Sequence, residues 1–194
     1  MEEITQLDWS LFQIIHYRLR NDFFDIIMPL MRNRNTWIPL YVLILIYAFY
    51  KFTLSKAIVI VLGLIATVAL ADFASSQVIK KSIKRPRPCH QHGNHTTVES
   101  LVNCGSGYSF PSSHASNHFG IAFYLILSGF LTLSWWKRAA LLWAFGVSFA
   151  QVYVGLHYPV DILGGALLGI TVAYFVWSLL CKFYFNRLNA HPVT

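Results

Sequence analysis

The sequence predicts an all-α protein, a polytopic membrane helix bundle with five or six spans and an N-terminal amphipathic helix at the membrane interface. Hydrophobic residues make up 56% of the 194-residue chain and charged residues only 12%, too few to coat a soluble globule of this size. Several apolar runs are also long enough to cross a bilayer. Because no internal repeat or low-complexity linker divides residues 1–194, we expect a single membrane-embedded domain.

The first 35 residues predict an amphipathic, interfacial start rather than a span. Residues 5–20 carry apolar side chains at helical spacing and end in Arg18 and Arg20, which predicts a helix lying on the membrane surface. The next stretch, DFFDIIMPLM, has about ten residues with two aspartates and Pro29, and is too short to span. We expect a half-buried connector here, with a short sixth span as the alternative.

Five apolar runs predict the membrane spans. They cover approximately 37–54, 55–79, 118–136, 139–156 and 160–181, the first of them only if Lys51 extends its ammonium to the interface.

Cations indicate how the spans are oriented. Lys51 with Lys56, the predicted turn Trp135–Arg138, and Lys182 with Arg187 all fall on one side, which should be cytoplasmic. The long loop 80–115 and the corner 157–160 then face the exterior, so we expect a bacterial inner membrane protein with an extracytoplasmic site. The net charge of +7 gathers at span ends, where cations meet lipid headgroups, and this argues against a nucleic acid partner.

Three polar clusters stand at span ends on the predicted outer side. The first, VIKKSIKRPRPCH, contains five cations: Lys80, Lys81, Lys84, Arg85 and Arg87. Alone it would be read as a headgroup anchor. The second is PSSH at 111–114, where Ser112 can cap a helix whose free N–H groups bind phosphate oxygens and whose first turn displays His114.

The third cluster, VGLHYPVD, places a histidine and a carboxylate at the corner between two spans. Pro159 prevents one continuous helix and folds His157 and Asp161 toward each other. A carboxylate beside an imidazole fixes its tautomer and makes the other ring nitrogen a better nucleophile. Two histidines, a carboxylate and converging cations therefore predict a reaction centre for a phosphate ester.

The three clusters resemble the signature motifs of the type 2 phosphatidic acid phosphatase superfamily, membrane lipid phosphatases related to vanadium haloperoxidases. The family patterns are Lys-x6-Arg-Pro, Pro-Ser-x-His and Ser-Arg-x5-His-x3-Asp. They match Lys80, Arg87 and Pro88; Pro111, Ser112 and His114; and His157 and Asp161. In layout the chain also resembles the bacterial undecaprenyl-pyrophosphate phosphatases of the bacitracin-resistance type.

The resemblance implies a two-step, metal-independent reaction with no cofactor. His157 would attack phosphorus while Asp161 holds its far nitrogen, and His114 would protonate the leaving oxygen and then activate water. Phosphate binding is implied for Lys80, Arg87 and the N–H groups around Ser112 and Ser113, the last of which stands where glycine is commonest.

One position departs from the family pattern. Where the third motif has Ser-Arg, this chain has Ala150-Gln151, so a bidentate cation is missing and Gln151 offers a neutral hydrogen bond instead. Lys84 and Arg85 are the loop cations that could replace its charge.

Other polar residues have open roles. Asp72 shares a helix face with Lys80, and either supports it or pairs within the bundle. Asn117 and His118, one turn after His114, could contact a headgroup. Gly164, Gly165 and Gly169 suggest close helix packing.

The loop cysteines allow two interpretations. Cys89 and Cys104 flank His90, His92 and His95, so the loop could hold zinc, but the spacing matches no familiar site and a disulfide is favoured. Cys181, at the opposite membrane face, should be a free thiol.

The sequence therefore predicts a lipid phosphatase whose partners are a lipid phosphate and the bilayer. The candidate substrates are undecaprenyl pyrophosphate, phosphatidylglycerophosphate, phosphatidate and a lipid A phosphate. The alternatives are a lipid phosphotransferase, in which another lipid intercepts the phosphohistidine, and a non-catalytic lipid-phosphate binding protein. The oligomeric state is not indicated.

Overall fold

The computed structural model describes residues 2–90 and 98–185 as a set of helices and connecting loops. The longer elements are α1 (Glu2–Gln13), α2 (Asp22–Arg32), α3 (Ile38–Lys51), α4 (Leu54–Phe73), α6 (Ser113–Leu127), α7 (Ser134–Tyr153) and α8 (Pro159–Leu180). The short ones are η1 (Ile14–Arg18), η2 (Arg34–Trp37), η3 (Ala74–Ile79), α5 (Lys80–Ile83), η4 (Pro88–His90) and η5 (Cys181–Phe185).

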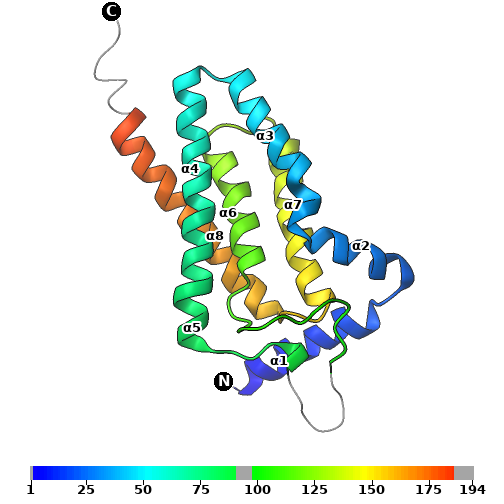
Figure 1. Ribbon diagram of the computed structural model, residues 1–194. Coiled ribbons are helices and arrows are strands. Elements are labelled where there is room, and N and C mark those ends of the chain that lie inside the picture. Colours follow the sequence, from blue (N-terminus) through cyan, green and yellow to red (C-terminus); the bar gives the residue numbers. More distant parts are fainter. Residues whose placement is uncertain (1, 91–97, 186–194) are drawn as a thin grey trace, which may run out of the picture.

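Helix α6 is the centre of the bundle. It packs against α8 most extensively and then against α7 and α4, while α3 lies on the outside (Figure 1). Helix α1, α5 and the loop leading into α6 gather at one end, and the α3–α4 and α6–α7 connections lie at the other. The three polar motifs, at the end of α4–α5, the start of α6 and the α7–α8 corner, therefore meet at one end of the bundle.

Glycines let α6 and α8 approach closely. A Cβ at Gly165 would overlap the carbonyl oxygen of Ser112, and one at Gly169 would overlap that of Ser116. A Cβ at Gly164 would collide with the ring of Phe110. Close packing thus places the start of α6 directly against the first turns of α8, and it explains why these positions have no side chain.

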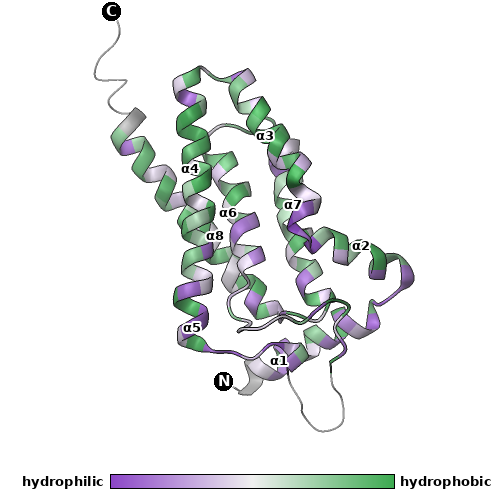
Figure 2. Ribbon diagram, viewed as in Figure 1, coloured by the Kyte–Doolittle hydropathy of each residue, from purple (hydrophilic) through white to green (hydrophobic). Residues whose placement is uncertain are grey.

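The outer faces of the bundle are apolar. Two helical stretches, Leu54–His90 and Pro159–Phe183, are long and apolar enough to cross a membrane. Their outward side chains are large and exposed, as Leu62, Ile65, Leu163, Leu167 and Tyr174 show. In Figure 2 hydrophobic residues cover α3, α4 and α8, whereas hydrophilic residues are frequent at the end formed by α1 and α5.

The predicted boundary between the third and fourth spans is wrong. Helix α6 ends at Leu127 and α7 begins at Ser134, so Trp135–Arg138 lie in the first turns of α7 and do not form the turn. Gly129 adopts a positive φ of 69°, and the N–H of Leu131 donates a 3.2 Å hydrogen bond back to the carbonyl of Leu125, which ends the helix. The apolar composition continues through this stop, which is why composition alone misplaced it.

The N-terminal helix has an inward face different from the apolar stripe of the sequence. Leu7 and Leu11 are exposed, whereas Asp8, Phe12 and His16, at positions i, i+4 and i+8, are buried against the rest of the protein. The Nδ1–H of His16 donates a 2.7 Å hydrogen bond to the carbonyl oxygen of Tyr153. The segment therefore rests on the end of the bundle while its leucines point outward.

The connector after α1 forms a true helix. The side chain of Asn21 caps α2 by accepting a 3.0 Å hydrogen bond from the Phe24 N–H, and α2 then packs along α7. Pro29 lies inside this helix, and Arg32 stands in its last turn.

Candidate active site

The α7–α8 corner presents His157 from a tight turn. Gly155 has a φ of 88°, which a residue without a side chain adopts freely, and the N–H groups of Leu156 and His157 both point at the carbonyl oxygen of Gln151. Pro159 then begins α8. The turn holds the His157 side chain inside the protein, where it is 2% exposed.

Asp161 in the first turn of α8 is fixed by three groups. Its Oδ2 lies 3.4 Å from Nδ1 of His157 and accepts a 2.9 Å hydrogen bond from the Tyr158 N–H. Its Oδ1 accepts a 2.7 Å hydrogen bond from the guanidinium of Arg85. A fully buried carboxylate held this way can orient the imidazole and stabilise positive charge on it.

Burial lowers the pKa of His157 to about 4, although Asp161 acts in the opposite direction. The imidazole is therefore neutral near pH 7. With its proton on Nδ1, toward Asp161, the Nε2 atom carries a free lone pair and is suited to attack an electrophile.

The start of α6 brings the second motif to the same place. The Ser112 N–H donates to the backbone carbonyl of Asp161 at 2.9 Å, so this group serves the α6–α8 contact and is not free for a ligand. The Ser112 side chain caps α6 through the Ala115 N–H, and the Ser113 hydroxyl accepts a 2.9 Å hydrogen bond from Ser75.

His114 faces the charged groups of the other two motifs. The charges of Lys80 and His157 act on its ring, which places all three residues in one neighbourhood. His118 lies parallel to His114 with ring centres 6.3 Å apart, and its Nδ1 bonds the His114 carbonyl at 2.8 Å. His118 therefore supports the turn that carries His114, and its other nitrogen lies 3.4 Å from the hydroxyl of Tyr41.

Two of the five cations in the first motif, Lys80 and Arg87, have charges that act on His157. Lys80 is half-buried and interacts electrostatically with Arg87 and Asp161. Arg87 donates to the carbonyl of Cys104 at 3.0 Å. Lys84 is exposed and has a positive φ of 54°.

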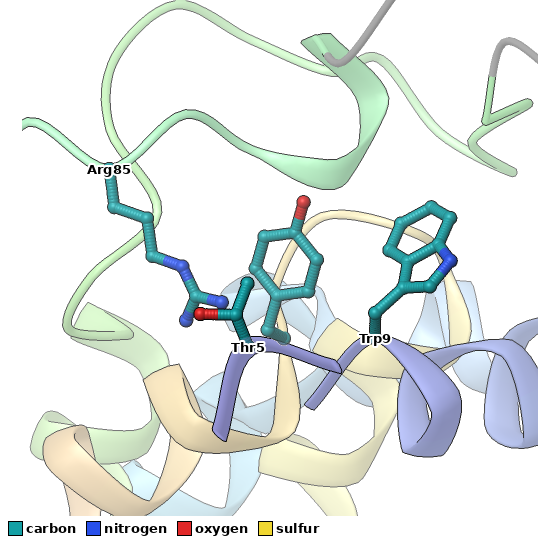
Figure 3. Close-up of a pocket in the computed structure, with 4 residues that line it drawn as sticks. Thr5, Trp9 and Arg85 are labelled. Carbon is teal, nitrogen blue, oxygen red and sulfur yellow. The ribbon is translucent and has the colours of Figure 1, made fainter. Parts of the chain in front are cut away.

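Arg85 is occupied by two carboxylates rather than open to a ligand. Besides Asp161 it pairs with Asp8 of α1, and its guanidinium carbon lies 4.0 Å from the centre of the Tyr158 ring. Figure 3 shows Arg85 with Thr5 and Trp9 of α1 at the pocket that they line. Asp8 also accepts a 2.9 Å hydrogen bond from the Val160 N–H at the start of α8. The expected role of Arg85 as a substitute phosphate ligand therefore does not match its geometry, because its charge is already balanced.

Sequence reasoning missed Asp8. A signal was present, since Asp8 shares a helix face with Phe12 and His16, and an acid on a buried face needs a partner.

Beside the Arg85–Tyr158 pair lies a cavity of about 300 Å³, lined by Thr5, Trp9, Arg85 and Tyr158.

The remaining candidates have definite places. Gln151 is buried, and neither atom of its amide has a hydrogen-bond partner among the described residues. Asp72 accepts a 3.2 Å hydrogen bond from Asn117, linking α4 to α6, and its charge also acts on Lys80.

The loop cysteines form a disulfide. Cys89 bonds to Cys104 and Cys181 is free. A ring nitrogen of His90 lies within 4.8 Å of both sulfurs, but bridged sulfurs are not the thiolates that bind zinc; His92 and His95 lie outside the described residues. The disulfide connects the end of the first motif to the loop that leads into the second.

Comparisons with known proteins cover the part of the chain that holds these three motifs. The PAP2 superfamily profile matches residues 57–185. A lipid A 4'-phosphatase of Bacteroides thetaiotaomicron is 30% identical over 171 residues, covering 87% of this chain and 75% of the relative. An undecaprenyl-diphosphatase BcrC of Bacillus subtilis is 24% identical over 169 residues, covering 87% and 81%.

The fold has a counterpart among solved structures. The chain superimposes with a TM-score of 0.70 on a transmembrane PAP2-type phosphatidylglycerolphosphate phosphatase from Bacillus subtilis, covering 94% of this chain and 89% of that one at 23% identity. The comparisons confirm the predicted family and the predicted class of activity, hydrolysis of a lipid phosphate. On the strength of the matched profile and the motifs that it contains, this chain belongs to the PAP2 superfamily.

Proposed function

We propose that the protein removes a terminal phosphate from a membrane lipid through a phosphohistidine on His157. The observation that carries this proposal is the His157–Asp161 pair, with its 3.4 Å contact and its second carboxylate oxygen held by Arg85. Lys80, Arg87 and His114 surround this pair, so a neutral nucleophile stands among groups that attract an anion. The chemistry needs no metal, because the cations neutralise the phosphate oxygens.

The first step forms a covalent bond between enzyme and phosphate. Nε2 of His157 attacks phosphorus as the bond between phosphorus and the lipid oxygen breaks, and His114 gives that oxygen a proton. Asp161 stabilises the positive imidazole that results. In the second step His114 accepts a proton from water, the water oxygen attacks phosphorus, and the N–P bond breaks to release inorganic phosphate and restore His157.

Binding of the phosphate falls to the side chains and helix end that face His157. Lys80 and Arg87 lie close enough to the pair for their charges to act on it. The N–H groups of Ser113 and His114 at the start of α6 add to this, whereas the N–H of Ser112 is bonded to Asp161 and that of Ala115 to the Ser112 side chain. Gln151 supplies a neutral hydrogen bond at the position of the family arginine.

The membrane arrangement that we propose has five spans. These are α3, the rod formed by α4, η3 and α5, and then α6, α7 and α8, with α1 at the interface. The reaction centre then lies at one bilayer surface, within reach of a headgroup whose acyl chains stay in the membrane. We place this surface outside the bacterial inner membrane, because Lys51, Lys137 and Lys182 cluster at the other end.

Phosphate release from a panel of lipids tests the function. The purified protein in detergent is given a lipid A phosphate, undecaprenyl pyrophosphate, phosphatidylglycerophosphate and phosphatidate, and inorganic phosphate is measured. Lipid A phosphate comes first, because the Bacteroides relative bears that name. Release from one or more of these lipids is expected, and the preferred lipid is the one with the highest kcat/KM.

The covalent step has its own test. His157→Ala should abolish release, and Asp161→Asn should lower it by orders of magnitude, because the imidazole loses its orienting charge. Labelled phosphate should be trapped on the wild-type protein by rapid quenching and be absent from His157→Ala. Near-normal release by His157→Ala would show that the nucleophile is another group.

A further inference from the structure

Arg32 is a half-buried cation that no carboxylate balances. It stands in the last turn of α2, and its Nε atom is enclosed without a hydrogen-bond partner among the described residues. Within residues 2–90 and 98–185 no ion pair involves its guanidinium. Enclosing a charge without a partner is costly, so such an arrangement calls for an anion that arrives from outside the chain.

The charge of Arg32 acts on two residues of the reaction centre. One is Arg87 of the first motif, and the other is His114 of the second. Burial lowers the pKa of Arg32, and the neighbouring charge of Arg87 lowers it further. Two arginines that repel each other beside a histidine form a site in which a bound phosphate would relieve the repulsion.

Packing fixes the end of α2 next to this centre. Met31 contacts α7 at Gly146, where an added Cβ would lie 2.9 Å from its methyl group. The Trp37 ring donates a 2.8 Å hydrogen bond to the Met31 carbonyl and lies 5.5 Å from the ring of Trp143 on α7.

A row of rings continues from α7 toward the second motif. Trp143 is 4.8 Å from His118, and His118 is stacked on His114. Figure 2 shows hydrophilic residues where α2 meets α3, beside α7. Helix α7 also carries Gln151, which stands at the position of the absent family arginine. Helix α2, which packs against α7, carries Arg32.

We infer that Arg32 takes the place of the family arginine and is a third cationic ligand of the substrate phosphate, supplied by α2 instead of α7. The inference rests on the proposed function for the identity of the substrate. Gln151, with an unpaired amide on the neighbouring helix α7, would add a neutral hydrogen bond. The guanidinium thus comes from a different helix, and the total of cations at the phosphate is kept.

Transfer of the arginine between the two helices tests this inference. Arg32→Ala should lower kcat/KM for the preferred lipid by about ten- to a hundredfold, the effect of losing a charge-assisted contact to phosphate. Adding Gln151→Arg to Arg32→Ala should recover at least about tenfold, because the arginine returns to the family position. Arg32→Lys should fall between the wild type and Arg32→Ala.

Arg34 provides the matched control. It is exposed and stands two residues beyond Arg32, so Arg34→Ala should leave kcat/KM within about twofold of the wild type. If Arg32→Ala behaves like Arg34→Ala, or if the folded double variant recovers nothing, Arg32 only complements the dipole at the end of α2 and the inference is wrong.

Inorganic phosphate gives a readout that does not depend on turnover. Millimolar phosphate should raise the midpoint of thermal unfolding of the wild type, and this shift should shrink in Arg32→Ala and return with Gln151→Arg. If no lipid is hydrolysed but the Arg32-dependent shift remains, the proposed function fails and the anion site stands. If lipids are hydrolysed and the shift is the same in every variant, the inference fails alone.

Discussion

Arg85 holds together three segments that are distant in the sequence. Its guanidinium bonds Asp161 of α8 and Asp8 of α1, and the Tyr158 ring covers it. Because Asp161 is fully buried, its charge must be balanced at close range, and Arg85 is positioned to do this. The residue therefore acts on the reaction through Asp161, as a positioning residue.

Asp8→Asn tests this arrangement. The amide oxygen can still accept a hydrogen bond from the Val160 N–H, but the negative charge facing Arg85 is lost. We therefore expect the free energy of unfolding to fall by roughly 1 to 3 kcal/mol. Release of lipid phosphate should fall through kcat rather than KM, because Asp161 loses its fixed neighbour and not a ligand contact.

Asp22→Asn is the control, since Asp22 is exposed at the start of α2. Equal kcat values for Asp8→Asn and Asp22→Asn would show that Asp8 only attaches α1 and does not position Asp161. Recovery of kcat in Asp8→Glu would support the role of the charge.

The sequence predicted the residues of the reaction centre better than their partners. His157 and Asp161 lie four positions apart around Pro159, so their proximity follows from local geometry. Asp8 and Arg32 belong to segments whose docking depends on long-range packing. The helix face that Asp8 shares with Phe12 and His16 indicates a buried acid, but no local pattern identifies its partner. Arg85 was expected to face the phosphate because the sequence shows its charge but does not show that Asp8 and Asp161 pair with it.

The contact between α6 and α8 depends on having no side chain at Gly165. Gly165→Ala would press its Cβ against the Ser112 carbonyl and separate the second motif from the third, at a cost of about 1 to 3 kcal/mol. We expect a lower unfolding temperature and a marked loss of phosphate release.

Gly146→Ala offers a comparison on α7, because its nearest neighbour is the flexible end of Met31. It should be tolerated with activity close to the wild type. Comparable losses in the two variants would mean that alanine is unfavourable for a reason unrelated to the α6–α8 contact.

The docking of η1 should depend on pH through His16. Burial lowers the pKa of His16, with Arg20 also lowering it while the Tyr153 carbonyl and Asp25 oppose the change. The folded protein therefore favours the neutral ring, and the stability this gives is complete above the unfolded pKa of about 6.5 and is lost as the pH falls below it.

Thermal unfolding in detergent at about pH 7.5 and about pH 5 measures this effect. The wild type should lose more stability on acidification than His16→Gln, which cannot titrate. The difference between the two proteins isolates His16 from His157, whose pKa is also lowered by burial. An equal loss in both proteins would exclude His16 as the cause.

Helix positions were largely predictable and helix ends were not. The last apolar run, 160–181, agrees closely with α8, and the surface helix expected at 5–20 corresponds to α1 and η1. Hydrophobicity reports which residues can lie in lipid, but backbone conformation decides where a helix stops, as the positive φ of Gly129 shows.

For the whole molecule, the cysteines report orientation. An impermeant thiol reagent on intact cells should leave Cys181 unlabelled and should label Cys89 and Cys104 only after reduction, because these two are bonded and lie at the end that we place outside. Cys181 is half-buried, so the positive control uses permeabilised cells in which the protein is partly unfolded by denaturant. Labelling of Cys181 in intact cells would reverse the proposed orientation.

The contacts of Asp8 have a consequence for biosynthesis. A ribosome makes α1 first, but the partners of Asp8, Arg85 and the Val160 N–H, are made about 77 and 152 residues later. Arg85 can balance the early carboxylate once the chain has reached the loop after α5, but until α8 has entered the membrane Arg85 lacks Asp161 and His157 has no carboxylate to orient it. The enzyme should therefore stay silent throughout its insertion, and gain activity in one step when its last helix arrives.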